Sequence, residues 1–157
     1  MTSTDHSSAL VPDSQIARLH IQHAAVIVGG AFILVGILGF VPGVTTHYHG
    51  TGGMGFSGRH SSAELLGVFR VSVLHNGLHL LLGGAGLIAS FKPLWARLYL
   101  LLGGVVYLVL FVYGLLIDFD SDANFVPLNT ADNWLHLGLA LAMIAVGLVV
   151  GRRRRDA

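Results

Sequence analysis

The chain has 157 residues, of which 54% are hydrophobic and 11% are charged, and its formal net charge is +1. A water-soluble domain carries about a quarter charged residues, so this balance favours lipid as the main solvent and gives no basic nucleic-acid-binding surface. The absence of cysteine excludes disulfides, thiolate metal ligands and cysteine nucleophiles.

Four apolar segments are each long enough to cross a bilayer as a helix, which takes about 20 residues. Their Gly, Ala, Leu and Val content suits helices and not the alternating strands of a barrel. We therefore expect an all-α fold, an integral membrane four-helix bundle within residues 16–151. Its spans are expected at about 19–41, 65–90, 95–117 and 133–151.

The polar ends and loops predict the orientation. Residues 1–15 are rich in Ser, Thr and Asp and indicate a disordered tail, and residues 152–157 form a basic tail. Arg18, Lys92 and Arg97 lie on the same side as these tails, whereas the two long loops hold most of the acidic residues. The positive-inside rule then places both termini in the cytoplasm, in a multi-pass protein of the cytoplasmic (inner) membrane.

The first long loop, "HYHGTGGMGFSGRH", contains His47, His49, Met54 and His60. Imidazoles with a thioether suit copper, and His-x-His is a plausible chelate. A glycine-rich loop loses much conformational entropy on binding, and no carboxylate partner is nearby. We favour a solvated loop over a metal site.

Within the second span, His75 and His79 are four residues apart and share one helix face. The same face carries small and polar residues, namely Ser72, Asn76, Gly83, Gly86 and Ser90. Similar stripes mark the other spans: Gln22, Gly29 and Gly36; Tyr99, Gly103, Tyr107 and Gly114; and His136, Ala140, Gly147 and Gly151. Such stripes face neighbouring helices, so we expect the histidines to point inward.

Arg70 has an ordinary explanation. On a helix it would lie about 9 Å of rise past Glu64, near the outer interface. Snorkelling, or pairing with an aspartate of an outer loop, accounts for it without a functional role.

The second long loop opens with "DFDSDAN". This string resembles a calcium loop, but Ala123 and Asn129 replace the glycine and the glutamate that an EF-hand requires. A weak surface cation site or a simple topology signal fits better. Downstream, Thr130 is the expected N-cap of the last span, with Asp132 near its positive end.

Two pairs of strings indicate an internal repeat. "ARLHI" (17–21) opens the first span and "ARLYL" (96–100) opens the third, while "NGLHL" (76–80) in the second span matches "NWLHL" (133–137) in the fourth. The halves would be two parallel helical-hairpin repeats. His79 and His136 then occupy equivalent positions.

The intramembrane cluster of His75, His79 and His136, with Tyr107, has three interpretations. Interhelical hydrogen bonds to the structural polar residues Asn76 and Asn133 or to tyrosine hydroxyls are the one we favour. A second is a transition metal held by the three histidines, or a haem bracketed by His79 and His136. A third is a proton or small-solute pathway.

No motif indicates an enzyme. The leading hypothesis is a small structural or accessory membrane component that packs with itself as a homo-oligomer or with a larger membrane complex. The alternative is a histidine-ligated protein of electron transfer or metal handling.

Three long strings, "LGVFRVSVLHNGLHLLLGGAGL", "LLLGGVVYLVLFVYGLLID" and "ANFVPLNTADNWLHLGLALAMIAVGL", resemble an uncharacterised bacterial four-span family, domain of unknown function 4383. The resemblance covers about residues 21–151. It implies an integral membrane protein and no particular activity.

Overall fold

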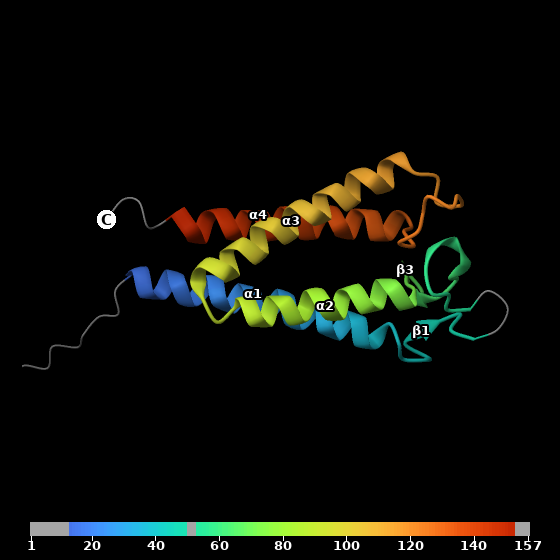
Figure 1. Cartoon of the computed structure of the whole chain (residues 1–157), viewed down its shortest axis with the longest axis horizontal. Coiled ribbons are helices and arrows are strands. Elements are labelled where there is room, and N and C mark those ends of the chain that lie inside the picture. Colours follow the sequence, from blue (N-terminus) through green and yellow to red (C-terminus); the bar gives the residue numbers. More distant parts are fainter. Residues whose placement is uncertain (1–12, 50–52, 153–157) are drawn as a thin grey trace, which may run out of the picture.

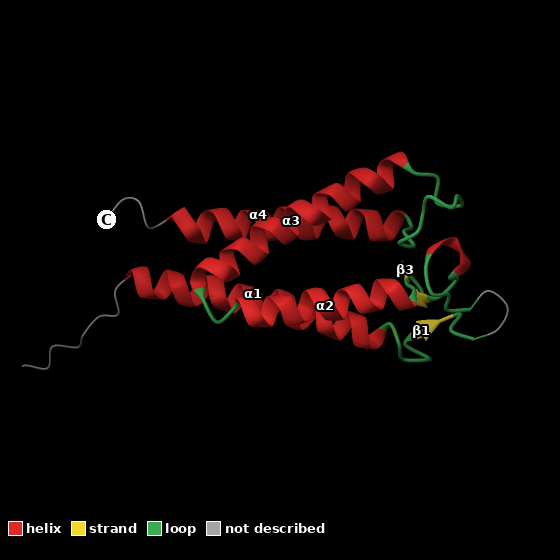
Figure 2. Ribbon diagram, viewed as in Figure 1, coloured by secondary structure: helices red, strands yellow, loops and turns green. Residues whose placement is uncertain are grey.

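The computed structural model describes residues 13–49 and 53–152, and this part of the chain forms four α-helices. They are α1 (Asp13–Leu38), α2 (Val73–Ala89), α3 (Pro93–Leu116) and α4 (Thr130–Arg152). Figures 1 and 2 show two antiparallel hairpins, α1–α2 and α3–α4, that run in the same direction. Contacts are most extensive within each hairpin, and between the hairpins α1 contacts both α3 and α4 while α2 contacts α3. The expected all-α fold is confirmed.

Three of the helices, α1, α3 and α4, are long and apolar enough to cross a membrane. The 17 residues of α2 rise only about 25 Å, less than the roughly 30 Å of a bilayer core. The predicted second helix is therefore wrong at its outer end, because it begins at Val73 and not at Leu65. Leu66 and Gly67 adopt positive φ angles of 55° and 68°, which a continuing α-helix does not allow.

The ends of the first helix also differ from the expectation, since α1 begins at Asp13 and ends at Leu38. The apolar run shows where lipid begins, whereas a helix continues into the polar residues beyond it. Residues 13–15 of the expected disordered tail are thus helical. Residues 1–12, and the basic tail from residue 153 onward, lie outside the described residues.

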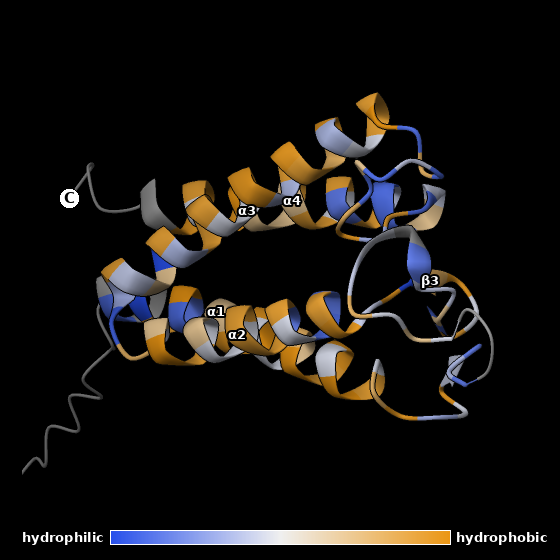
Figure 3. Ribbon diagram, turned by 45° about the vertical axis from the view of Figure 1, so that its right-hand side comes forward, coloured by the Kyte–Doolittle hydropathy of each residue, from blue (hydrophilic) through white to orange (hydrophobic). Residues whose placement is uncertain are grey.

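The distribution of side chains is the reverse of that in a water-soluble protein. Large apolar residues such as Ile27 and Leu81 are 70% and 71% exposed, while His75, Asn76 and Asn133 are buried. In Figure 3, hydrophobic residues predominate in the middle of both hairpins, and hydrophilic residues gather toward the two ends. Helices of this kind hide their polar groups from a surrounding that is itself apolar. The chain is a membrane protein by this pattern.

One end of the hairpins carries a loop cap, formed by the described residues of 39–72 together with 117–129. It contains a three-stranded antiparallel sheet, in the order β1 (Thr45–Thr46), β2 (Glu64–Leu65), β3 (Phe69–Arg70), and a short 3₁₀ helix, η1 (Gly58–His60). Ala63, Leu65 and Val71 form its small core. Arg70 is thus on a strand and not on a helix, directly opposite Glu64. The other end of the hairpins, with the α2–α3 turn, is called the turn end below.

The two loops of the cap are joined to each other. Gly58 N donates to Phe125 O at 2.8 Å, and Asn129 Nδ2 donates to Val68 O at 2.7 Å. Val73 N also donates to Gly55 O at 3.1 Å, so the first loop lies against the start of α2. The described part of the glycine-rich loop is therefore held against the second loop and the start of α2.

Candidate functional site

The buried histidines of α2 are positioned by the helix start. Ser72, the N-cap, accepts a hydrogen bond through its hydroxyl from His75 N at 3.1 Å. One turn later, His79 Nδ1 lies 3.0 Å from His75 O, and the two imidazoles are stacked with ring centroids 4.4 Å apart. The i, i+4 spacing thus produces a stacked imidazole pair on the inner face of α2.

A chain of ring contacts links this pair to the other three helices. Phe32 of α1 contacts His79 edge-on at 5.5 Å and Tyr107 of α3 at 5.4 Å between centroids. Tyr107 in turn contacts His136 of α4 at 5.2 Å. We call these five residues, His75, His79, Phe32, Tyr107 and His136, the ring cluster. It is the place where all four helices contribute an aromatic side chain to one continuous contact.

Two nitrogen atoms of the ring cluster lack partners. The residues His75 and His136 are only 5% and 4% exposed, and their Nδ1 atoms are buried without a hydrogen bond. An unsatisfied buried polar group costs about 1–3 kcal/mol. Within the cluster, a further ligand that bonds to these two atoms would therefore relieve the largest free-energy cost.

Two asparagines flank the cluster, and each packs directly against a glycine of the same hairpin. The carboxamide of Asn76 occupies the space where Gly39 would carry a Cβ, and that of Asn133 does the same at Gly114. Both asparagines are buried, and their Oδ1 atoms have no hydrogen-bond partner. The asparagines fix the helix approach within each hairpin by shape.

The contacts of the two hairpins match one another. Phe32–His79 in the first corresponds to Tyr107–His136 in the second. The shift in residue number from Phe32 to Tyr107 also takes Gly39 to Gly114, and the shift from His79 to His136 also takes Asn76 to Asn133. The second shift takes the N-cap Ser72 to the N-cap Asn129. The two shifts together take the side-chain hydrogen bond from Gln22 to Ser90 O to the one from Arg97 to Gly147 O. The fold therefore contains two parallel hairpin repeats, with the Phe32–Tyr107 contact between them.

One part of the expected repeat is wrong in register. The match of "NGLHL" with "NWLHL" agrees with the contacts, but that of "ARLHI" with "ARLYL" does not. Gln22 corresponds to Arg97 by its contacts, so the two ARL strings are offset by one helical turn. A shift of four residues rotates a helix by only about 40°, which leaves the same face inward.

The inward orientation predicted for the histidines is confirmed, because His75 and His136 are buried and His79 is half-buried. The favoured interhelical hydrogen bonds are not present: within the described residues, none joins these histidines to Asn76, Asn133 or a tyrosine hydroxyl. Stacking and edge contacts hold the histidines in place, in addition to the His79–His75 backbone contact. Within the described residues, no group of three or more His, Cys, Asp or Glu side chains is placed to hold a metal ion. The metal and haem ligand sets stay predictions.

The loop histidines are separate from this site. His47, His49 and His60 are all exposed, and His49 contacts Tyr48 edge-on at 4.8 Å. Met54 is half-buried and packs on the cap core, with its Sδ 4.0 Å from Asn76 Nδ2. The copper site, which we considered for this loop as the less favoured alternative, is likewise neither confirmed nor contradicted.

Sequence reasoning missed the hydrogen bonds of two buried polar residues, Asn124 and Asp132. Asn124 binds the second loop together, donating to Phe119 O and Leu128 O and accepting from Leu128 N, at 2.9, 3.0 and 2.9 Å. Asp132 accepts from Arg70 N at 3.1 Å and from Asn129 N at 3.0 Å.

The start of α4 also corrects the expected N-cap. Asn129 Oδ1 accepts from Asp132 N at 2.9 Å, and Asp132 reciprocates by accepting from Asn129 N. Thr130 is the first helical residue, so Asn129 is the cap. This reciprocal pair is a capping box, and the Asn-x-x-Asp spacing was the signal that could have revealed it.

Comparison with known proteins agrees with the resemblance. The family model described as "Domain of unknown function (DUF4383)" matches residues 22–149. This match spans most of the chain, so the chain belongs to that family. Neither the curated proteins nor the solved structures give a significant match.

Proposed function

We propose that this member of the DUF4383 family is a non-enzymatic, four-span structural or accessory component of the cytoplasmic membrane. In this proposal α2 crosses the bilayer with the loop cap completing its span, and both termini are cytoplasmic. The ring cluster is then an internal core that joins the two hairpins. The exposed helix faces contact lipid and a second membrane protein or copy of the chain.

The observation that carries this proposal is the position of Phe32 and Tyr107. Their rings stand between His79 and His136 in the chain of contacts. A haem with these histidines as axial ligands would need both rings to leave. Aromatic pairs of this kind contribute about 0.5–1.5 kcal/mol beyond their buried area, which supports a packing role.

The test combines composition with stability. The protein purified in detergent is expected to be colourless and to hold far less than one metal ion per chain. His136→Ala should lose about 2 kcal/mol or more, because it leaves a cavity, whereas the ring-preserving His136→Phe should retain most of the stability. A Soret band, or equal stability loss in both variants, would contradict the packing role.

The accessory role needs a separate measurement. Cross-linking in native membranes should give a defined species heavier than the monomer, either an oligomer of the chain or a complex with another membrane protein. A chain that remains monomeric at every cross-linker concentration would contradict this part of the proposal.

A second candidate function follows from the unpartnered Nδ1 atoms of His75 and His136. Neutral imidazole nitrogens bind copper and zinc well, so these atoms are the pair we assign to a transition metal. About one metal ion per chain, lost in both His75→Phe and His136→Phe, would favour this function. If no metal ion is bound after reconstitution with copper or zinc, this second function is excluded.

A further inference from the structure

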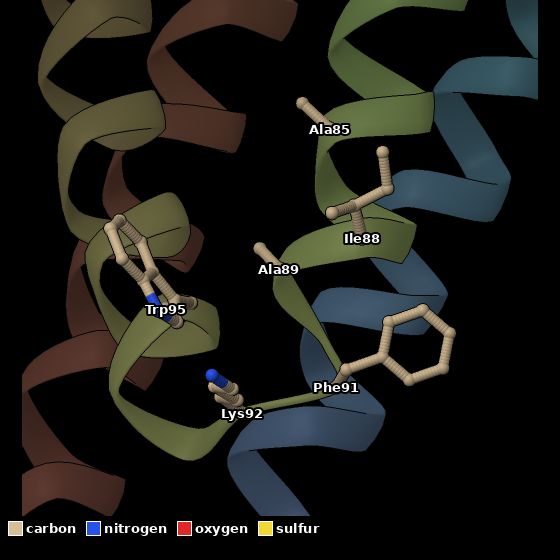
Figure 4. A pocket seen from close by; sticks show the side chains of 6 residues that line it. All are labelled: Ala85, Ile88, Ala89, Phe91, Lys92 and Trp95. Carbon is tan, nitrogen blue, oxygen red and sulfur yellow. The ribbon is translucent and has the colours of Figure 1, made fainter.

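The turn end carries a groove that the ring cluster does not use. It has a volume of about 610 Å³, within the range of about 300–1,000 Å³ typical of ligand pockets. It is lined by Ala85, Ile88, Ala89, Phe91, Lys92 and Trp95. Figure 4 shows Trp95 on one side and the three α2 residues on the other, with Lys92 between them at the base. An apolar wall therefore faces an ammonium group and an indole.

The groove is recessed relative to the neighbouring helix ends. In Figure 1, the α2–α3 turn stops short of both the start of α1 and the end of α4. Ala89, the last residue of α2, is equivalent to Val146 of α4 in the second repeat, and α4 continues beyond Val146 to Arg152. This continuation amounts to about one and a half turns, or roughly 9 Å. We therefore expect Lys92 near the boundary between headgroups and acyl chains.

The charge at this position favours an anion. The Lys92 side chain is exposed, and among the described residues no carboxylate forms a salt bridge with it. Lys92 is also the N-cap of α3 and gives no side-chain capping bond, unlike Ser72 and Asn129, which are the N-caps of α2 and α4. The free N–H groups of this helix start add to the positive potential. Arg18 and Arg97 lie at the same end of the chain's helices and carry the same sign.

The apolar wall favours an anion that carries an acyl chain over a soluble anion. Ile88 is 72% exposed, and the same face of α2 continues to Leu81, which is 71% exposed. An acyl chain can lie along this face without leaving the bilayer. A soluble anion would gain nothing from it.

We propose that the groove binds one anionic phospholipid. Its phosphate lies at Lys92 and the Trp95 indole N–H, and one acyl chain follows Ala85, Ile88 and Ala89. Tryptophan is common at the headgroup level, where its ring is apolar and its N–H is polar. One lysine near a charged headgroup contributes about 1 kcal/mol, so its loss weakens binding about fivefold.

The chain offers a direct reporter for this lipid. It has two tryptophans, and Trp134 lies in the first turns of α4 at the cap end, so Trp134→Phe leaves Trp95 as the single tryptophan. In detergent micelles, brominated phosphatidylglycerol should quench Trp95 saturably, at a mole fraction about fivefold lower than brominated phosphatidylcholine. In the same background, Lys92→Gln should remove this preference and Lys92→Arg should keep it.

Two further variants make the test specific. Arg18→Gln removes one exposed positive charge at the same end but outside the groove, and should leave the preference unchanged. Ala85→Phe fills the groove and should reduce quenching by both lipids, with helix content by circular dichroism as the folding control. Equal quenching by the two lipids, or an unchanged preference in Lys92→Gln, would overturn the proposal. So would displacement of the lipid by excess inorganic phosphate, since this would indicate a site for a free anion.

Discussion

The close approach of α1 and α2 depends on Gly83, and its neighbour Gly84 provides a matched control. A Cβ at Gly83 would lie 2.7 Å from Gly29 O, 2.8 Å from Ile33 N and 2.6 Å from Ile33 Cγ1. Ordinary contact begins at 3.4 Å, and two of these atoms are backbone, so the hairpin would have to open. Overpacking of this kind costs about 1–3 kcal/mol.

A Cβ at Gly84 meets nothing within 4 Å. Gly84→Ala should therefore be neutral or gain up to about 1 kcal/mol from helix propensity. The two variants should differ by about 1–4 kcal/mol in the free energy of unfolding. The assay is unfolding by sodium dodecyl sulfate in mixed micelles, followed by circular dichroism and tryptophan fluorescence. Equal stability of the two variants, or greater loss in Gly84→Ala, would refute the assigned packing.

Two further predictions concern the loop cap. Asn129→Ala should lose about 1 kcal/mol of stability through the N-cap, whereas Thr130→Ala should lose little; the same unfolding assay checks this, and the reverse order would return the cap to Thr130. Asn124→Ala removes the side-chain partner of the buried Leu128 carbonyl and N–H and of the half-buried Phe119 carbonyl. Amide hydrogen exchange in residues 117–129 should then become at least about tenfold faster while that of α1 is unchanged, and equally slow exchange would show that Asn124 does not hold the loop.

The helices could be predicted from the length and composition of the apolar segments, and the inward face of the histidines from helical periodicity. Small and polar residues recur at helical spacing, and the bilayer makes their burial obligatory. The second helix start could not be predicted in the same way. The run from Leu65 to Phe69 is apolar whether it forms a helix or a strand, and hydropathy does not distinguish the two. Only the turn at Leu66 and Gly67 separates them.

The repeat shows which sequence signals carry register. "NGLHL" and "NWLHL" contain an asparagine and a histidine whose contacts are specific, so their alignment agrees with the structure. "ARLHI" and "ARLYL" share letters but not contacts, and a slip of one turn leaves the same face inward. The ring contacts of Phe32 and the hydrogen bond from Arg70 N to Asp132 depend on partners far away in sequence, so no local pattern reveals them.

The contact between Phe32 and Tyr107 is the point on which the account depends, because it joins the two hairpins at the ring cluster. The natural absence of cysteine allows a double variant, Phe32→Cys with Tyr107→Cys, to be tested with a short thiol cross-linker in membranes. Ile27→Cys with Leu102→Cys is the matched control: the repeat relates these positions too, but their side chains are 70% and 63% exposed. The first pair should cross-link within one chain, and the second should not. Failure of the first pair while each single cysteine reacts with a monofunctional reagent, or equal cross-linking of the control pair, would contradict the account.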